Sequence, residues 1–256
     1  MKRKELIKII GKRMDTIHEH ALSIAITGDK EAIHALRVQF KKLRAAIRLS
    51  RLEHQKRPPH IPEPLKELYR QAGVLRDRQL HYERIAGCYE HDPEKPAAYL
   101  DQLSHEIKTS HDHLHQTIDA FPFDGVRSGL MSHLPRRLHK KTFRVFFRRQ
   151  KDRYEELAPR AHSDEEIHSV RKCIKDILYN DEWQHLPGRG PGHQEKKEWK
   201  QIEVAVGEYN NLRMDLTLLH DHLPPSEPRA SKLRLLEKVW LHKKQLLKKR
   251  ARSRLK

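Results

Sequence analysis

The chain has 256 residues, of which 34% are charged and 36% apolar, and an excess of Lys and Arg gives it a formal net charge of +18. Few glycines and the lack of alternating β-branched runs favour helices over sheets, so we expect an all-α fold. Such a positive charge repels itself unless an anion is near, and it points to nucleic acid, an anionic membrane or another polyanion as the partner.

Two sequence features bear on the compartment. Cys88 and Cys173 are too few for a disulfide framework and match no metal-site spacing, which suits a reducing environment. Lys8 and Lys12 interrupt the first apolar stretch before a signal-peptide core can form. Because no segment has the roughly 20 apolar residues that span a bilayer, we expect a cytoplasmic protein without a membrane partner.

Turn-forming residues divide the chain into eight expected helices. Most of these helices would have about 20 to 30 residues, and their short connections are typical of antiparallel bundles. The expected turns are residues 27–29, 56–64, 91–96, 121–125, 158–164, 186–194 and 223–228.

An internal repeat relates positions whose numbers differ by 134, as those of His34 and His168 do. This offset superposes polar and apolar positions alike, and it places the helix-capping candidate Asp29 on Ser163, which forms a capping box with Glu166. Further aligned pairs are Arg37 with Arg171, Lys41 with Lys175, Gly73 with Gly207, Ile33 with Ile167, Leu36 with Val170, and Phe40 with Ile174. We therefore expect one domain over residues 1–256, built by duplication from two pseudo-symmetric four-helix bundles, residues 1–122 and 123–256.

The stretch "IHALRVQFKKLRAAIRLS", residues 33–50, carries a stripe of cations directly beside its apolar face. At about 100° per residue, five side chains share an arc of about 80°: His34, Arg37, Lys41, Arg44 and Arg48. A solvated face would mix in acids, and like charges at i,i+4 destabilise a helix, so this stripe indicates an anion site. It spans about 21 Å, which suits a chain of phosphates better than a single one.

The second half carries a shorter version of this stripe, with His168, Arg171, Lys172 and Lys175. Leu178 then stands where the first half has Arg44, and Asp176 where it has Lys42. We expect the first half to bind an anion more strongly.

Other basic residues are candidates for the same surface. Arg76 lies on the inward face of the third expected helix, where it braces the histidine helix, reaches the anion itself, or forms an internal ion pair. The neighbouring Gly73 and its counterpart Gly207 are expected to permit close helix approach. The fifth expected helix carries four cations at i, i+4, i+7 and i+11, which line the same surface or form a separate solvated face: Arg137, Lys141, Arg144 and Arg148.

The motifs "IHALRVQFKKLRAAIRL" and "AGVLRDRQL", followed by "IHSVRKCIKDILY" and "VGEYNNLRMDL", resemble the conserved histidine α-helical domain (CHAD) family over essentially the whole chain. The most specific parts are the two His-x-x-Arg motifs, each followed at the same interval by a glycine, Gly73 after His34 and Gly207 after His168. The resemblance implies two pseudo-symmetric four-helix bundles that bind inorganic polyphosphate through a basic surface and associate with polyphosphate granules.

By resemblance, the polyphosphate-binding residues are His34, Arg37, Lys41 and Arg44 in the first half and His168, Arg171, Lys172 and Lys175 in the second. Arg48 joins them as part of the first stripe. Asn211 replaces Asp77 in the second repeat, a further departure in the weaker half.

Three other functions compete with polyphosphate binding as interpretations of the sequence. No phosphate-binding loop, dinucleotide turn or carboxylate group that would hold Mg²⁺ is recognisable, so we expect no catalysis and no cofactor. His111 and His115 share a helix face but lack a third ligand, so we expect no metal site. Nucleic-acid binding stays open as the alternative, although the stripes contain no interleaved aromatic residues on which bases could stack.

Overall fold

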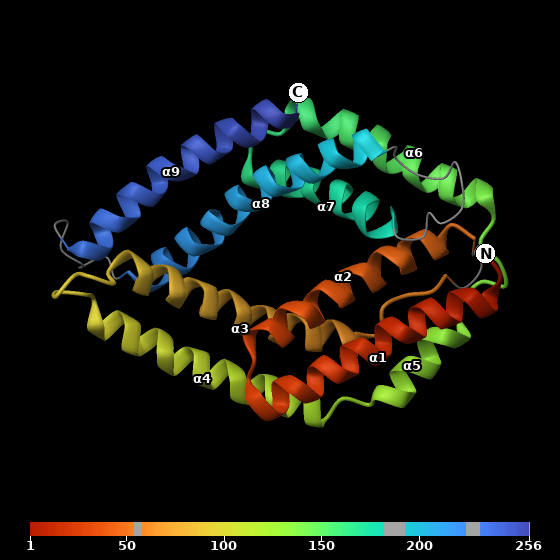
Figure 1. Cartoon of the computed structure of the whole chain (residues 1–256), viewed down its shortest axis with the longest axis horizontal. Helices are drawn as coiled ribbons and strands as arrows, with labels where there is room; N and C mark the ends of the chain where they lie inside the picture. Colours follow the sequence, from red (N-terminus) through yellow and green to blue (C-terminus); the bar gives the residue numbers. More distant parts are fainter. Residues whose placement is uncertain (54–57, 182–192, 224–230, 256) are drawn as a thin grey trace. The chain divides into compact units, whose positions relative to one another are not determined.

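The computed structural model describes residues 1–53, 58–181, 193–223 and 231–255 (Figure 1). These residues form nine α-helices and one 3₁₀ helix, and the part of the chain described contains no β-strand, so the all-α prediction is confirmed. In chain order the helices are α1 (Arg3–Thr27), α2 (Lys30–Arg51), α3 (Glu63–Cys88), α4 (Ala97–Asp119), α5 (Phe123–Ser132), α6 (Lys140–Leu157), η1 (Ala158–Arg160), α7 (Asp164–Asp181), α8 (His193–His222) and α9 (Lys232–Leu255).

The described turns fall close to the predicted ones, but α3 begins at Glu63 and α5 at Phe123, inside the turns predicted at 56–64 and 121–125. Three of the predicted turns lie partly outside the described residues. Of the turn at 186–194 only residues 193 and 194 are described, of the turn at 223–228 only Leu223, and of the turn at 56–64 all but residues 56 and 57. No helix in the described ranges combines the length and apolar character needed to cross a membrane.

One predicted helix is divided in the structure. The sequence predicted continuous helix between the turns at 121–125 and 158–164, but α5 ends at Ser132 and α6 begins at Lys140. Pro135 lies in the gap, where its missing N–H and its restriction of the preceding residue disfavour a helix. Arg137 is therefore not on α6 but in an isolated bridge with Lys2, and its predicted helical spacing from Lys141 is wrong.

The chain divides into two compact units, Met1–Phe146 and Phe147–Lys256, so that the division falls within α6. In the first unit α1 packs on α2, α2 on α3, α3 on α4 and α4 on α1, which closes a four-helix bundle, and α5 covers α1 (Figure 1). Its core consists of long aliphatic side chains that recur at helical spacing, among them Ile10, Met14, Leu43, Leu65 and Leu103, all with no exposed surface.

The second unit has its own core around α7, α8 and α9. α8 packs between α7 and α9, and η1 contacts both of these outer helices. Val170, Ile174 and Val206 are completely buried in this core, and Tyr154 of α6 meets Trp199 of α8 edge to face, with 4.5 Å between ring centroids.

The helix bounds of the two halves correspond at the offset that relates the histidine motifs. The first residue of α2, Lys30, falls on the first residue of α7, Asp164, and the last residue of α3, Cys88, falls on the last residue of α8, His222. Both predicted caps are present: Asp29 accepts hydrogen bonds from two backbone N–H groups of α2, and Ser163 and Glu166 exchange theirs at the start of α7. The duplication itself stays a prediction from the sequence.

Glu53, just after α2, fixes the start of α6 in the first unit. Its Oε1 accepts a hydrogen bond from the His139 backbone N–H at 2.7 Å and another from the Thr142 hydroxyl. Burial raises the pKa of Glu53, but the hydrogen bonds from Thr142 and His139 lower it by more, so it lies below the ordinary value of 4.5. The carboxylate caps α6 from a distant part of the sequence.

Glu53→Ala is expected to lower the free energy of unfolding at pH 7 by about 1 to 2 kcal/mol, because it leaves the first turn of α6 without its acceptor. Because folding lowers the pKa of Glu53, this residue contributes fully to the free energy of unfolding when the pH is above its ordinary pKa. The contribution is lost as the pH falls through the lower pKa of the folded state. The difference from wild type, measured by thermal unfolding, should therefore shrink below about pH 4. Glu19→Ala, at an exposed position of α1, is the control and should show neither effect.

Candidate anion-binding surface

Helix α2 positions the first stripe by burying the face beside it. Its apolar side chains have at most 2% of their surface exposed, which confirms the predicted face: Ile33, Leu36, Phe40, Leu43 and Ile47. His34 is exposed, while the four cations that follow it on the stripe are half-buried. The stripe thus lies at the edge of the core, where α3 is its neighbour.

Arg37 occupies a seat formed by three residues of α3. Its side chain is only 16% exposed, with Nη2 at 3.9 Å from Asp77 Oδ1 and Cζ at 5.0 Å from the ring centroid of Tyr69. A Cβ atom added to Gly73 would overlap Arg37 Nη1. The glycine therefore makes room for the guanidinium group.

The two repeat-related glycines are not equivalent. A Cβ atom on Gly207 would meet nothing within 4 Å, whereas one on Gly73 would strike Arg37. We expected both glycines to serve close helix approach, but no described atom of another helix lies close to the Cβ position of Gly207, and the group close to Gly73 is a side chain of the stripe.

Arg44 lies against two aromatic rings. Its Cζ is 5.7 Å from the ring centroids of both Phe40 and Tyr69, and these rings stack on each other at 4.1 Å with an interplanar angle of 14°. A ring face attracts a guanidinium group without cancelling its charge. The stripe itself contains no aromatic residue, as the sequence indicated, but Tyr69 reaches it from α3.

Arg76 joins the N-terminal end of the stripe from α3. Its side chain is 12% exposed and its Nη2 lies 3.7 Å from Glu31 Oε1, while its Nε and Nη1 are buried without a hydrogen-bond partner. The pKa of His34 lies below the ordinary value of 6.5, because of partial burial first and then the charges of Arg76 and Lys41. Arg76 thus forms an ion pair, one of the alternatives considered, with a carboxylate that is 68% exposed, and it also acts electrostatically on His34.

One lysine of the second stripe, on α7, forms an ion pair with an acid of its own unit. Lys175 Nζ lies 2.8 Å from Glu203 Oε1 of α8, and the two side chains are only 18% and 13% exposed. Burial raises the pKa of Glu203, but hydrogen bonds and charge from Lys175 and then Lys200 lower it to about 2. The carboxylate is therefore ionised at neutral pH and neutralises the lysine beside it.

The remaining residues of the second stripe are less constrained. Lys172 is exposed, Arg171 is half-buried, and Arg171 Nε is buried without a hydrogen-bond partner. The pKa of His168 lies below its ordinary value because of burial and the charge of Lys172, although a hydrogen bond with Asn210 acts in the opposite direction. His34 and His168 therefore share the lowered pKa that the cationic surroundings predict.

The additional basic surface proposed on α6 is retained in part. Lys141, Arg144 and Arg148 are exposed and lie at i, i+3 and i+7, which places them on one helix face. Arg137 is exposed as well but precedes the helix. That these cations line the same surface as the α2 stripe stays a prediction.

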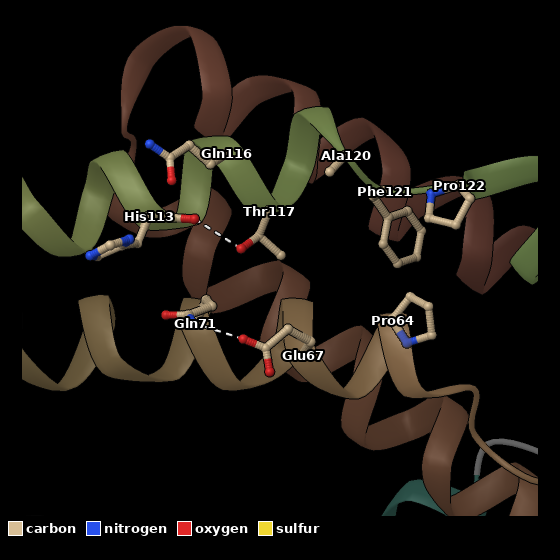
Figure 2. Close-up of a pocket in the computed structure, with 9 residues that line it drawn as sticks. All are labelled: Pro64, Glu67, Gln71, His113, Gln116, Thr117, Ala120, Phe121 and Pro122. Atoms are coloured by element: carbon tan, nitrogen blue, oxygen red, sulfur yellow. Dashed lines mark hydrogen bonds between the residues drawn. The ribbon is translucent and has the colours of Figure 1, made fainter.

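A pocket between the start of α3 and the end of α4 does not suit an anion (Figure 2). Its charged lining residue, Glu67, accepts a hydrogen bond from Gln71 at 2.8 Å, and the other lining groups, such as His113 and Phe121, are histidine, amide, hydroxyl or apolar. Within the described ranges, no three His, Cys, Asp or Glu side chains are arranged to hold a metal ion.

Comparison with known proteins identifies the family. The profile of the CHAD domain matches residues 8–220, and the chain belongs to the CHAD domain family, as the histidine motifs predicted. The structure is similar to the crystal structure of the CHAD domain from the plant Ricinus communis, with a TM-score of 0.80 over 100% of this chain and 91% of that chain. The identity of 16% makes this a similarity of fold alone. Curated proteins provide no significant sequence match.

Alanine substitutions at the two glycines test the seat of Arg37. Gly207→Ala is expected to raise the free energy of unfolding by about 0.5 to 1 kcal/mol, the usual gain of alanine over glycine within a helix. Gly73→Ala should gain less or nothing, because its Cβ displaces the Arg37 guanidinium from Tyr69 and Asp77. Thermal unfolding of both variants measures the difference, and equal stabilisation would show that the seat has no energetic importance.

Proposed function

We propose that the chain binds inorganic polyphosphate along the α2 stripe, without catalysing a reaction, and that this binding lets it associate with polyphosphate granules. The observation that carries the proposal is Arg44, whose guanidinium lies on Phe40 and Tyr69 and has no acid within ion-pair distance in the described part of the chain. Arg44 therefore keeps a positive charge that no acid of the described residues neutralises. Arg37 lies two helical turns before it on the same stripe.

The shape of the stripe supports a linear ligand. His34 and Arg48 stand about 21 Å apart along α2, and the charged positions recur every three or four residues between them. Guanidinium groups bind phosphate oxygens with paired N–H donors, and lysine adds a mobile point charge. A chain of phosphates can contact side chains along the whole stripe, whereas a single phosphate can contact only neighbouring ones.

The absence of catalysis is part of the proposal and rests on the composition of the stripe. Arginine, lysine and histidine supply binding and charge, but phosphoryl transfer also needs a positioned nucleophile and acids that hold a metal ion. The acids beside the first stripe, Asp77 and Glu31, are directed to Arg37 and Arg76. Both carboxylates therefore act as ion-pair partners of arginine side chains.

Nucleic acid is the second candidate ligand, and Tyr69 is the observation that favours it. A half-buried tyrosine beside two guanidinium groups offers a ring on which a base could stack. One face of this ring is already used by Phe40, which stacks on it at 4.1 Å. This contact favours a ligand that needs phosphate binding alone.

A competition titration at about 0.15 M ionic strength tests the proposal. Labelled long-chain polyphosphate is displaced by triphosphate, single-stranded RNA or duplex DNA. Wild type is expected to prefer polyphosphate, and Arg37→Ala/Arg44→Ala to lose at least tenfold in affinity, since each guanidinium supplies a charge-assisted contact.

The control for this titration is Lys8→Ala/Lys12→Ala, which removes the same charge from exposed positions of α1 in the same unit. Its loss should be small if the stripe is the site. Equal losses in the two double variants would indicate general electrostatic attraction, and better competition by RNA or DNA than by triphosphate and polyphosphate would overturn the proposal in favour of nucleic acid.

The pH dependence of affinity tests the role of His34. Its pKa is below 6.5 in the free protein, and a bound phosphate oxygen favours the protonated ring, so binding raises this pKa. Affinity should therefore rise as the pH falls from about 8 to 6 and continue to rise until the free imidazole is itself protonated. His34→Gln should flatten this part of the profile relative to wild type, and an unchanged slope would assign the histidine a structural role.

A further inference from the structure

We infer that one repeat position, Tyr69 in the first half and Glu203 in the second, decides which stripe can accept a polyanion. The inference rests on the proposed function and makes it specific: in the second half, the Glu203 carboxylate takes the place at Lys175 that a phosphate would take. The first half has a neutral ring at this position, and Arg44 beside this ring keeps its charge available.

The two residues occupy the same place in their units. Tyr69 and Glu203 are related by the same offset that superposes His34 on His168, and they lie on α3 and α8, each packed against its own stripe helix. Each contacts the stripe directly. Tyr69 contacts Arg37 and Arg44, whereas Glu203 contacts Lys175, the counterpart of Lys41.

Glu203 binds its lysine firmly enough to compete with an external anion. The Lys175–Glu203 pair is short, at 2.8 Å, and largely shielded from water, and Lys200 adds a second contact to the same carboxylate at 3.0 Å. Removing one member of a buried ion pair leaves the other charge uncompensated, which is costly. An incoming phosphate would have to displace Glu203 from Lys175.

Within the described residues, the first stripe has no equivalent of this carboxylate at Arg44. Asp77 lies 3.9 Å from Arg37, at the limit of an ion pair, and its side chain is 37% exposed. Tyr69 instead contacts the guanidinium groups of Arg37 and Arg44 with its ring, and at Arg44 this contact leaves the charge uncancelled. Preorganised guanidinium groups that keep their charge are what a polyanion binds best.

The test restores the second stripe in a protein whose first stripe is disabled. In the Arg37→Ala/Arg44→Ala background, Glu203→Gln keeps the size of the side chain and removes its charge, and it should raise polyphosphate affinity about tenfold. The control is Glu208→Gln on the same helix, which changes the net charge equally but breaks a more exposed pair with Arg250. Equal gains, or no gain from Glu203→Gln in a protein whose circular dichroism is unchanged, would overturn the inference.

The reciprocal change tests the first half independently of whether Glu203→Gln folds. Tyr69→Glu in the otherwise unaltered chain should lower polyphosphate affinity about tenfold, because it places an acid beside Arg37 and Arg44. Tyr69→Phe keeps the ring and should bind like wild type. If Tyr69→Glu binds as well as Tyr69→Phe, the inference is wrong.

The outcomes separate this inference from the proposed function. A wild-type chain that shows no preference for polyphosphate defeats the proposed function itself. A wild-type chain that prefers polyphosphate, but whose affinity does not respond to the charge at residue 69 or 203, defeats only the inference.

Discussion

The burial of one face of α2 is the constraint on which the site depends. Ile33, Leu36 and Leu43 have at most 1% of their surface exposed, so the rotation of the helix about its axis is fixed by the core. The cations that adjoin this face in the helical arrangement are thereby held at the rim of the bundle. Their mutual repulsion reduces helix stability, and the hydrophobic packing of the bundle compensates for it.

Neighbouring α3 determines how these cations are used. Gly73 leaves a space that the Arg37 guanidinium fills, and Tyr69 provides the ring against which Arg37 and Arg44 lie. An acid at either position would have fixed the arginines equally well but would have neutralised them. Holding cations by an aromatic ring and a vacant Cβ position keeps them ordered and charged at the same time.

The two halves show how one fold can carry two electrostatic states. Both have a histidine with a lowered pKa at the start of the stripe and a second helix packed beside it. In the second half this helix contributes Glu203, whose short pair with Lys175 is formed within the unit. The same repeat position thus supplies an aromatic ring in one half and an internal counter-ion in the other, and this difference adds to the replacement of Arg44 by Leu178.

The sequence by itself determined the helical class, the caps at Asp29 and Ser163, the buried face of α2 and the family, because these depend on spacing along one helix or on local motifs. It did not reveal the break before α6, although Pro135 was a signal for it. Only the tertiary structure decided what Tyr69, Gly73 and Glu203 do. Each acts on a residue of a different helix, and the partner that it meets is fixed by the packing of two helices, which the periodicity of either helix alone does not specify.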